Sequence, residues 1–209
     1  MTWDHCPSDA EPPPYKEQAF EAAELAELCP SFLVDLLLKP PGREKFHDPT
    51  QVLHAADTYH GASLIGFTER ELGSSLKQRG AALSQIRSGL DDAGVSQPIH
   101  VFGVLDPVLV SFYFLCGGEV FDGLTWLRYG YKDGIGVHRD AAALLRGDLT
   151  SDSPTRSATT QLAYLAALRH LRLRLIAFTE TAEDYSLLGE HSAAIKHAVT
   201  SIPPFNERG

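Results

Sequence analysis

Two short apolar runs, SLIGF (residues 63–67) and PIHVFGV (98–104), flank the long stretch RELGSSLKQRGAALSQIRSGLDDAG (70–94). Both runs have the length of strands, whereas the stretch between them has helical spacing and ends at Gly94. The run EVFDGL (119–124) predicts another strand. Strands that alternate with helices at this spacing indicate parallel βα units, built either as a barrel or as an open doubly wound sheet.

The flanking sequence extends this pattern upstream and changes it downstream. Before residue 63 we predict strands in 1–4 and 32–38 and helices in 16–29 and 49–59, and Asp106 with Pro107 marks the start of a helix after residue 104. After residue 130 we predict a polar loop at 147–160 and helices at 161–178 and 187–199. The chain is therefore expected to contain an α/β domain at 1–135 and a helical extension at 136–209 that packs on it.

Composition restricts the class of protein. The chain has 209 residues, of which 44% are hydrophobic, and no apolar run reaches the roughly 20 residues that span a bilayer. The start MTWDHCPSDAEPPP shows no signal peptide, so we expect a cytoplasmic location and no membrane partner. The net charge of -9 argues against a generally basic surface, although a nucleic-acid site needs only a local basic patch.

The cysteines predict neither a disulfide framework nor a metal site. Cys6, Cys29 and Cys116 are an odd number and contain no CxxC pair. We therefore expect reduced thiols and no bound zinc or other cofactor.

Ligands of parallel βα sheets bind at the carboxyl ends of the strands. That rule selects the residues at or near the predicted strand ends, which are Asp4, Gly66, Phe102, Gly103 and Asp122. Asp122 has two interpretations on pattern alone: a functional carboxylate, or a helix N-cap or turn former that follows a strand.

Four segments resemble the tRNA-guanine transglycosylase family. PIHVFGVLDP (98–107) and LCGGEVFDGLTWLR (115–128) are similar to the last two barrel strands of that family, with Arg128 six residues after Asp122. LIGFTERELG (64–73) is similar to the Gly-Gly-Leu strand end of the family. MTWDHCP (1–7) is similar to its Phe-Asp-Glu-Cys strand end, with Asp4 and Cys6 in the matching places. The resemblance covers about residues 1–135 and implies a partial (β/α)8 TIM-type barrel of about five strands.

The resemblance also implies a reaction, the exchange of guanine for a 7-deazaguanine in nucleic acid through a covalent aspartyl-ribosyl intermediate. Asp122 would be the nucleophile and Asp4 would accept hydrogen bonds from the base. The backbone at Gly66 would approach the base edge, Phe102 would stack on its face, and Arg128 would hold a phosphate or a neighbouring base.

The sequence departs from the family in three respects. It lacks the cysteine-rich zinc site that follows the nucleophile, which makes it more similar to the zinc-free branch that modifies DNA with 7-deazaguanines, so DNA is favoured over tRNA. Three strands that precede Asp4 in the family, one of which carries an acid/base aspartate, have no counterpart. Five strands cannot close an eight-stranded barrel. We therefore expect either that the chain is a fragment of a split or truncated gene, or that a companion chain or a second copy completes the barrel. Finally, FLVDLLL (32–38) lacks the Gln with which the family contacts the base.

Two further groups of residues have a structural and a functional interpretation. His100 lies inside a predicted strand and is interpreted as an interior histidine rather than a catalyst. Arg169, Arg172 and Arg174 could bind phosphates, but an Arg-bearing amphipathic helix is more often a solvated face. For the whole chain the alternative to an enzyme is a catalytically silent subunit that binds a base or a partner.

Overall fold

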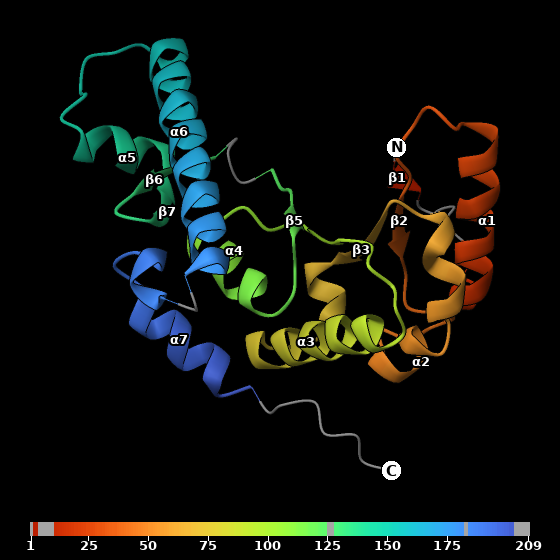
Figure 1. Cartoon of the computed structure of the whole chain (residues 1–209). Helices are drawn as coiled ribbons and strands as arrows, with labels where there is room; N and C mark the ends of the chain where they lie inside the picture. Colours follow the sequence, from red (N-terminus) through yellow and green to blue (C-terminus); the bar gives the residue numbers. More distant parts are fainter. Residues whose placement is uncertain (1, 4–10, 125–127, 182–183, 203–209) are drawn as a thin grey trace. The chain divides into compact units, whose positions relative to one another are not determined.

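Five parallel strands form one sheet whose spatial order follows the order of the chain (Figure 1). The computed structural model describes residues 2–3, 11–124, 128–181 and 184–202. The strands of this sheet are β1 (Thr2–Trp3), β2 (Asp35–Leu38), β3 (Leu64–Thr68), β4 (Ile99–Phe102) and β5 (Val120–Phe121).

This strand order decides between the two architectures that the sequence left open. Parallel crossovers are right-handed, so an order without reversal places the connecting helices on one face of the sheet. A doubly wound sheet requires a reversal of strand order, which the five described strands do not contain. The protein is therefore a singly wound parallel α/β fold over these strands, and closure into a TIM-type barrel stays a prediction.

The two faces of the sheet differ in chemistry. Strand side chains alternate between the faces, and one set in β2, β3 and β4 is wholly apolar and at most 1% exposed. This set comprises Leu36, Leu38, Ile65, Phe67, Ile99 and Val101. The opposite face carries a carboxylate, a glycine, an imidazole and an aromatic ring, and the candidate site lies on it.

The helices around the sheet begin at recognisable caps. They are α1 (Tyr15–Leu28), α2 (Pro49–Leu53), η1 (Ala56–Gly61), η2 (Glu69–Leu72), α3 (Leu76–Asp92) and α4 (Pro107–Leu115). The predicted start of α4 is confirmed, because the Asp106 side chain accepts hydrogen bonds from the backbone N–H groups of Val108 and Leu109. The helix predicted over 70–94 instead contains a break at Gly73, and its α-helical part begins after Ser75, whose hydroxyl accepts from the backbone N–H of Gln78.

The described residues form two compact units. The first contains the sheet with residues 1–103, 113–121 and 201–209, and the second contains residues 104–112 and 122–200. This division differs from the predicted segments 1–135 and 136–209.

The second unit contains a β-hairpin that the sequence analysis missed. Its strands are β6 (Tyr129–Lys132) and β7 (Ile135–His138), which pair antiparallel. Asp133 and Gly134 connect them with φ values of 52° and 81°, the left-handed conformation that two-residue hairpin turns need. The Asp-Gly pair is the usual sequence signal for such a turn, so this strand pair was predictable.

Helices complete the second unit: α5 (Arg139–Leu145), α6 (Ser153–Glu180), η4 (Tyr185–Leu188) and α7 (Ser192–Thr200). The polar loop predicted over 147–160 is wrong in its second half, because Asp152 caps α6 by accepting a hydrogen bond from the backbone N–H of Thr155. The hairpin packs on α6 through the stacked rings of Tyr131 and Tyr164, whose centroids are 4.3 Å apart. Among the described helices, none is long and apolar enough to cross a membrane.

Candidate functional site

A buried acid and a buried histidine meet across the centre of the sheet. Asp35 begins β2 and His100 lies in β4, so the two residues are separated by the intervening strand β3. The imidazole Nδ1 and the carboxylate Oδ2 are 2.6 Å apart, and both residues are 7% exposed. Because a carboxylate only accepts hydrogen bonds, Nδ1 carries the hydrogen and the pair fixes both the tautomer and the orientation of the ring.

Gly66 makes this contact possible. It lies in β3 between Leu37 and His100 in the strand register. A Cβ atom at Gly66 would lie 3.1 Å from Asp35 Oδ1 and 2.6 Å from Cε2 of Phe102. A larger residue would therefore occupy the space through which the carboxylate and the rings approach each other.

Phe102 completes the cluster. It is the last residue of β4 and shares a face with His100, because side chains two positions apart on a strand point the same way. The two rings are stacked with centroids 3.7 Å apart and planes inclined by 26°. Phe102 is partly exposed, so the stack extends from the buried, hydrogen-bonded Asp35–His100 pair toward the carboxyl end of the sheet. We call Asp35, His100 and Phe102 the sheet-face cluster.

One carboxylate oxygen of the cluster lacks a hydrogen-bond partner among the described residues. Asp35 Oδ1 is buried and receives no donor, whereas Oδ2 receives the His100 N–H. Buried carboxylate oxygens are ordinarily satisfied, because leaving one unpaired costs about 1–3 kcal/mol or more. The cluster therefore offers one acceptor that a ligand N–H group could use.

The predicted residues of the first unit are brought together only in part. Gly66 and Phe102 lie on the same face of the sheet, with the ring of Phe102 beside the glycine. Gly103 forms the turn after β4 with a φ of 88°, and a Cβ atom there would meet nothing within 4 Å. Asp4 and Cys6 lie outside the described residues.

Asp122 and Arg128 belong to the second unit, and both are exposed. Asp122 is the residue directly after β5, and the last residue of that strand, Phe121, pairs with Val101. Residues 125–127, which would belong to any helix that Asp122 caps, lie outside the described part of the chain, so both interpretations of Asp122 stay open. That Asp122 faces the same cavity as Asp4 and Phe102 stays a prediction.

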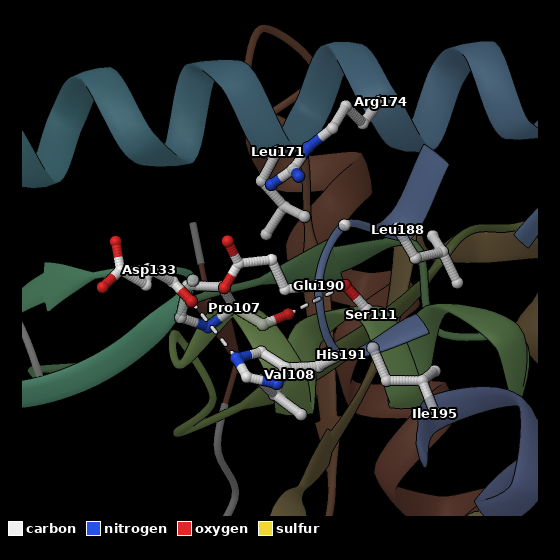
Figure 2. Close-up of a pocket in the computed structure, with 12 residues that line it drawn as sticks. Pro107, Val108, Ser111, Asp133, Leu171, Arg174, Leu188, Glu190, His191 and Ile195 are labelled. Carbon is white, nitrogen blue, oxygen red and sulfur yellow. Dashed lines mark hydrogen bonds between the residues drawn. The ribbon is translucent and has the colours of Figure 1, made fainter. Parts of the chain in front are cut away.

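A separate cavity of about 230 Å³ lies within the second unit (Figure 2). Its apolar wall includes Leu171, Leu188 and Ile195. Figure 2 shows Arg174, which descends from α6, and Glu190 directed into the same space. The cavity thus combines one cationic and one anionic side chain with an apolar wall.

His191 borders the same cavity. Its Nε2 atom and the backbone oxygen of Asp133, in the hairpin turn, are 3.1 Å apart. Since a carbonyl oxygen only accepts, Nε2 carries the hydrogen, and the bond ties the start of α7 to the hairpin.

The sequence analysis missed several of these residues. Asp35 stands in an apolar run that was assigned as a buried strand, and a charged residue inside such a run was the available signal. Glu190 and His191 had no signal, since they lie in a short connection between two helical elements. Arg174 was considered, but only as one of three similar arginines on a helix.

The remaining chemistry of the described residues is limited. No group of three His, Cys, Asp or Glu side chains within the described ranges could hold a metal ion. Burial raises the pKa of the Cys116 thiol to about 11, so this thiol is un-ionised and a poor nucleophile at neutral pH. No model of a known protein family and no curated protein matches the chain.

Proposed function

We propose that this protein is transglycosylase-like and exchanges guanine for a 7-deazaguanine in nucleic acid, with DNA as the favoured substrate. The singly wound order of the parallel strands supports this proposal, because it is the order that a (β/α)8 barrel requires. The observation that carries it furthest is the sheet-face cluster. A partly exposed ring at a strand end, backed by a buried imidazole, is suited to stacking a planar base.

Asp35 supports base recognition by the same face. Strand β2 corresponds to the family strand whose Gln contacts the base, and here it supplies a carboxylate with one unpaired oxygen. Guanine and 7-deazaguanine carry adjacent N–H donors on the ring and the amino group. A carboxylate accepts from such donors more strongly than an amide, since charge-assisted hydrogen bonds are about twice as strong.

The chemical step is assigned to Asp122. A carboxylate oxygen forms a bond to the anomeric carbon of the nucleotide while the bond from that carbon to the guanine nitrogen breaks, and the leaving base takes up a proton. The incoming deazaguanine loses a proton from its ring nitrogen and displaces the carboxylate. A carboxylate suits both the formation and the breakdown of the covalent intermediate, because both transition states resemble an oxocarbenium ion, which a negative charge stabilises, as in retaining glycosidases.

The first test measures base binding. Titration calorimetry of the purified chain with 7-deazaguanine should give saturable binding, and Phe102→Leu should weaken it about 5- to 150-fold, the equivalent of about 1–3 kcal/mol of stacking. Phe20→Leu is the matched control, because Phe20 is 64% exposed on α1. Equal affinity in both variants would remove Phe102 from the site.

The second test separates the enzyme from a catalytically silent base-binding subunit. The chain is supplied with a companion polypeptide that carries the missing barrel strands and their acid/base aspartate, because the chain alone is expected to show weak or no exchange. The mixture is incubated with guanine-containing DNA or tRNA and then denatured, and a covalent protein–nucleic acid adduct is sought on a denaturing gel. Asp122→Asn should abolish the adduct, whereas Asp92→Asn, a change at an exposed residue of α3, should not. Base binding without any adduct from the unaltered chain would favour the silent subunit.

A further inference from the structure

The cavity of the second unit contains a cation that has no partner in the described structure. Arg174 makes no hydrogen bond and no ion pair there, and its Nε atom is buried. One terminal nitrogen of the guanidinium packs against Gly189, where a Cβ atom would lie 2.6 Å away. Burying a guanidinium N–H without an acceptor is unfavourable, so this position favours an acceptor from outside the chain.

Glu190 lies at the same cavity and does not neutralise Arg174. The described structure contains no ion pair between them, so the guanidinium nitrogens and the carboxylate oxygens are more than 4.0 Å apart. Figure 2 draws both side chains at the cavity and marks no hydrogen bond between them. A guanidinium and a carboxylate held apart across one cavity match a ligand that carries both signs of charge.

The size and the wall of the cavity restrict the ligand further. Its volume of about 230 Å³ is below the range of about 300–1,000 Å³ typical for drug-sized ligands. Leu171, Leu188 and Ile195 provide apolar contact, and all three are at least 90% buried. A compact molecule with a short apolar body fits such a wall, whereas a nucleotide or a peptide is too large.

We propose that this cavity binds a small zwitterion with a short apolar side chain, of which a free apolar α-amino acid is the simplest example. Its carboxylate pairs with the guanidinium of Arg174 and its ammonium group with the carboxylate of Glu190. The apolar side chain lies against Leu171, Leu188 and Ile195. This site uses none of the residues assigned to base exchange, so a failure of either proposal leaves the other unaffected.

The test is calorimetry on the full chain with four probes: L-valine, L-leucine, N-acetyl-L-leucine, which lacks the ammonium group, and L-leucinamide, which lacks the carboxylate. The two amino acids should bind saturably. L-Leucinamide should bind at least about tenfold more weakly, because it leaves the guanidinium of Arg174 unpaired. N-acetyl-L-leucine should bind up to about fivefold more weakly, because the ion pair that it loses is with the exposed and screened carboxylate of Glu190.

Variants assign the two charged contacts. Arg174→Gln should weaken L-leucine binding about 10- to 100-fold, in line with the loss of charged hydrogen bonds worth about 1.5–3 kcal/mol. Glu190→Gln should weaken it by up to about fivefold, because Glu190 is exposed and its ion pair is screened. Arg172→Gln and Glu180→Gln are matched controls at exposed positions of α6 and should bind like the unaltered chain.

Three results would overturn the proposal. Absence of binding for both amino acids excludes the zwitterion. Equal affinity for L-leucine and N-acetyl-L-leucine would mean a simple anion site. Retained affinity for L-leucine in Arg174→Gln would mean that the amino acid binds elsewhere. Glu190→Gln changes only an exposed side chain and is expected to fold, so it tests the site even if Arg174→Gln does not fold.

Discussion

The buried histidine of the first unit makes a specific pH dependence of stability testable. The His47 side chain is 0% exposed, and its Nδ1 atom is 2.9 Å from the hydroxyl of Tyr15. Burial, with a smaller contribution from the charge of Lys39, lowers the pKa of the imidazole to about 3. Glu71 lies 4.0 Å from Nε2 and favours the protonated form, but burial dominates because no solvent reaches the ring.

The sign and size of the effect follow from linkage. The unfolded chain protonates His47 near pH 6.5, whereas the folded chain keeps it neutral down to about pH 3. The unfolded state therefore binds more protons within this window, and stability is lost as the pH falls through it. Each pH unit is worth about 1.4 kcal/mol, so acidification to about pH 4.5 should remove about 2.7 kcal/mol through this residue.

Urea unfolding followed by far-UV circular dichroism, at about pH 7 and about pH 4.5, measures this loss. Between these two pH values the free energy of unfolding of the unaltered chain should fall by about 2.7 kcal/mol more than that of His47→Gln. This difference does not depend on how stable the variant is at about pH 7. His54→Gln is the control, because His54 is exposed, and it should behave like the unaltered chain. If the unaltered chain and His47→Gln lose stability equally, His47 does not titrate as its burial requires.

Three other substitutions test the packing of particular elements. Asp35→Ala should destabilise the first unit by about 1–3 kcal/mol in urea unfolding, since it removes the acceptor of the buried His100 N–H, and an unchanged midpoint would contradict the pairing. Gly134→Ala should cost about 1 kcal/mol, seen as a lower melting temperature, because its φ of 81° strains any residue with a Cβ atom. Asp152→Ala should cost about 0.5–2 kcal/mol and reduce the helical signal, because it removes the cap of α6; a helical signal equal to that of the unaltered chain would show that the cap is not needed.

Local signals in the sequence were sufficient for most of the elements around the sheet. Apolar runs of strand length predicted the parallel strands, and an acid before a proline predicted the start of α4. The same kinds of signal were present where the prediction failed. Asp133 with Gly134 marks the hairpin turn, and Asp152 before Ser153 and Pro154 marks the start of α6. Both signals are local sequence patterns, so the hairpin and the start of α6 could have been predicted from the sequence.

Strand order and the sheet-face cluster were decided by the tertiary structure. A barrel and a doubly wound sheet share the same alternation of strands and helices, and only the pairing of the strands distinguishes them. Asp35 and His100 are 65 positions apart in the chain. Their contact depends on the register of three strands and on the missing side chain of Gly66, and no local pattern encodes either.

The arginines of α6 show the same division. Arg169, Arg172 and Arg174 have equal helix propensity and charge, so the sequence determines only that they lie on one helix. Folding leaves Arg169 and Arg172 exposed and places Arg174 at the cavity opposite Glu190. The physical reason is the periodicity of the helix: residues five positions apart point in different directions, and only the packing of neighbouring elements decides which direction becomes a cavity.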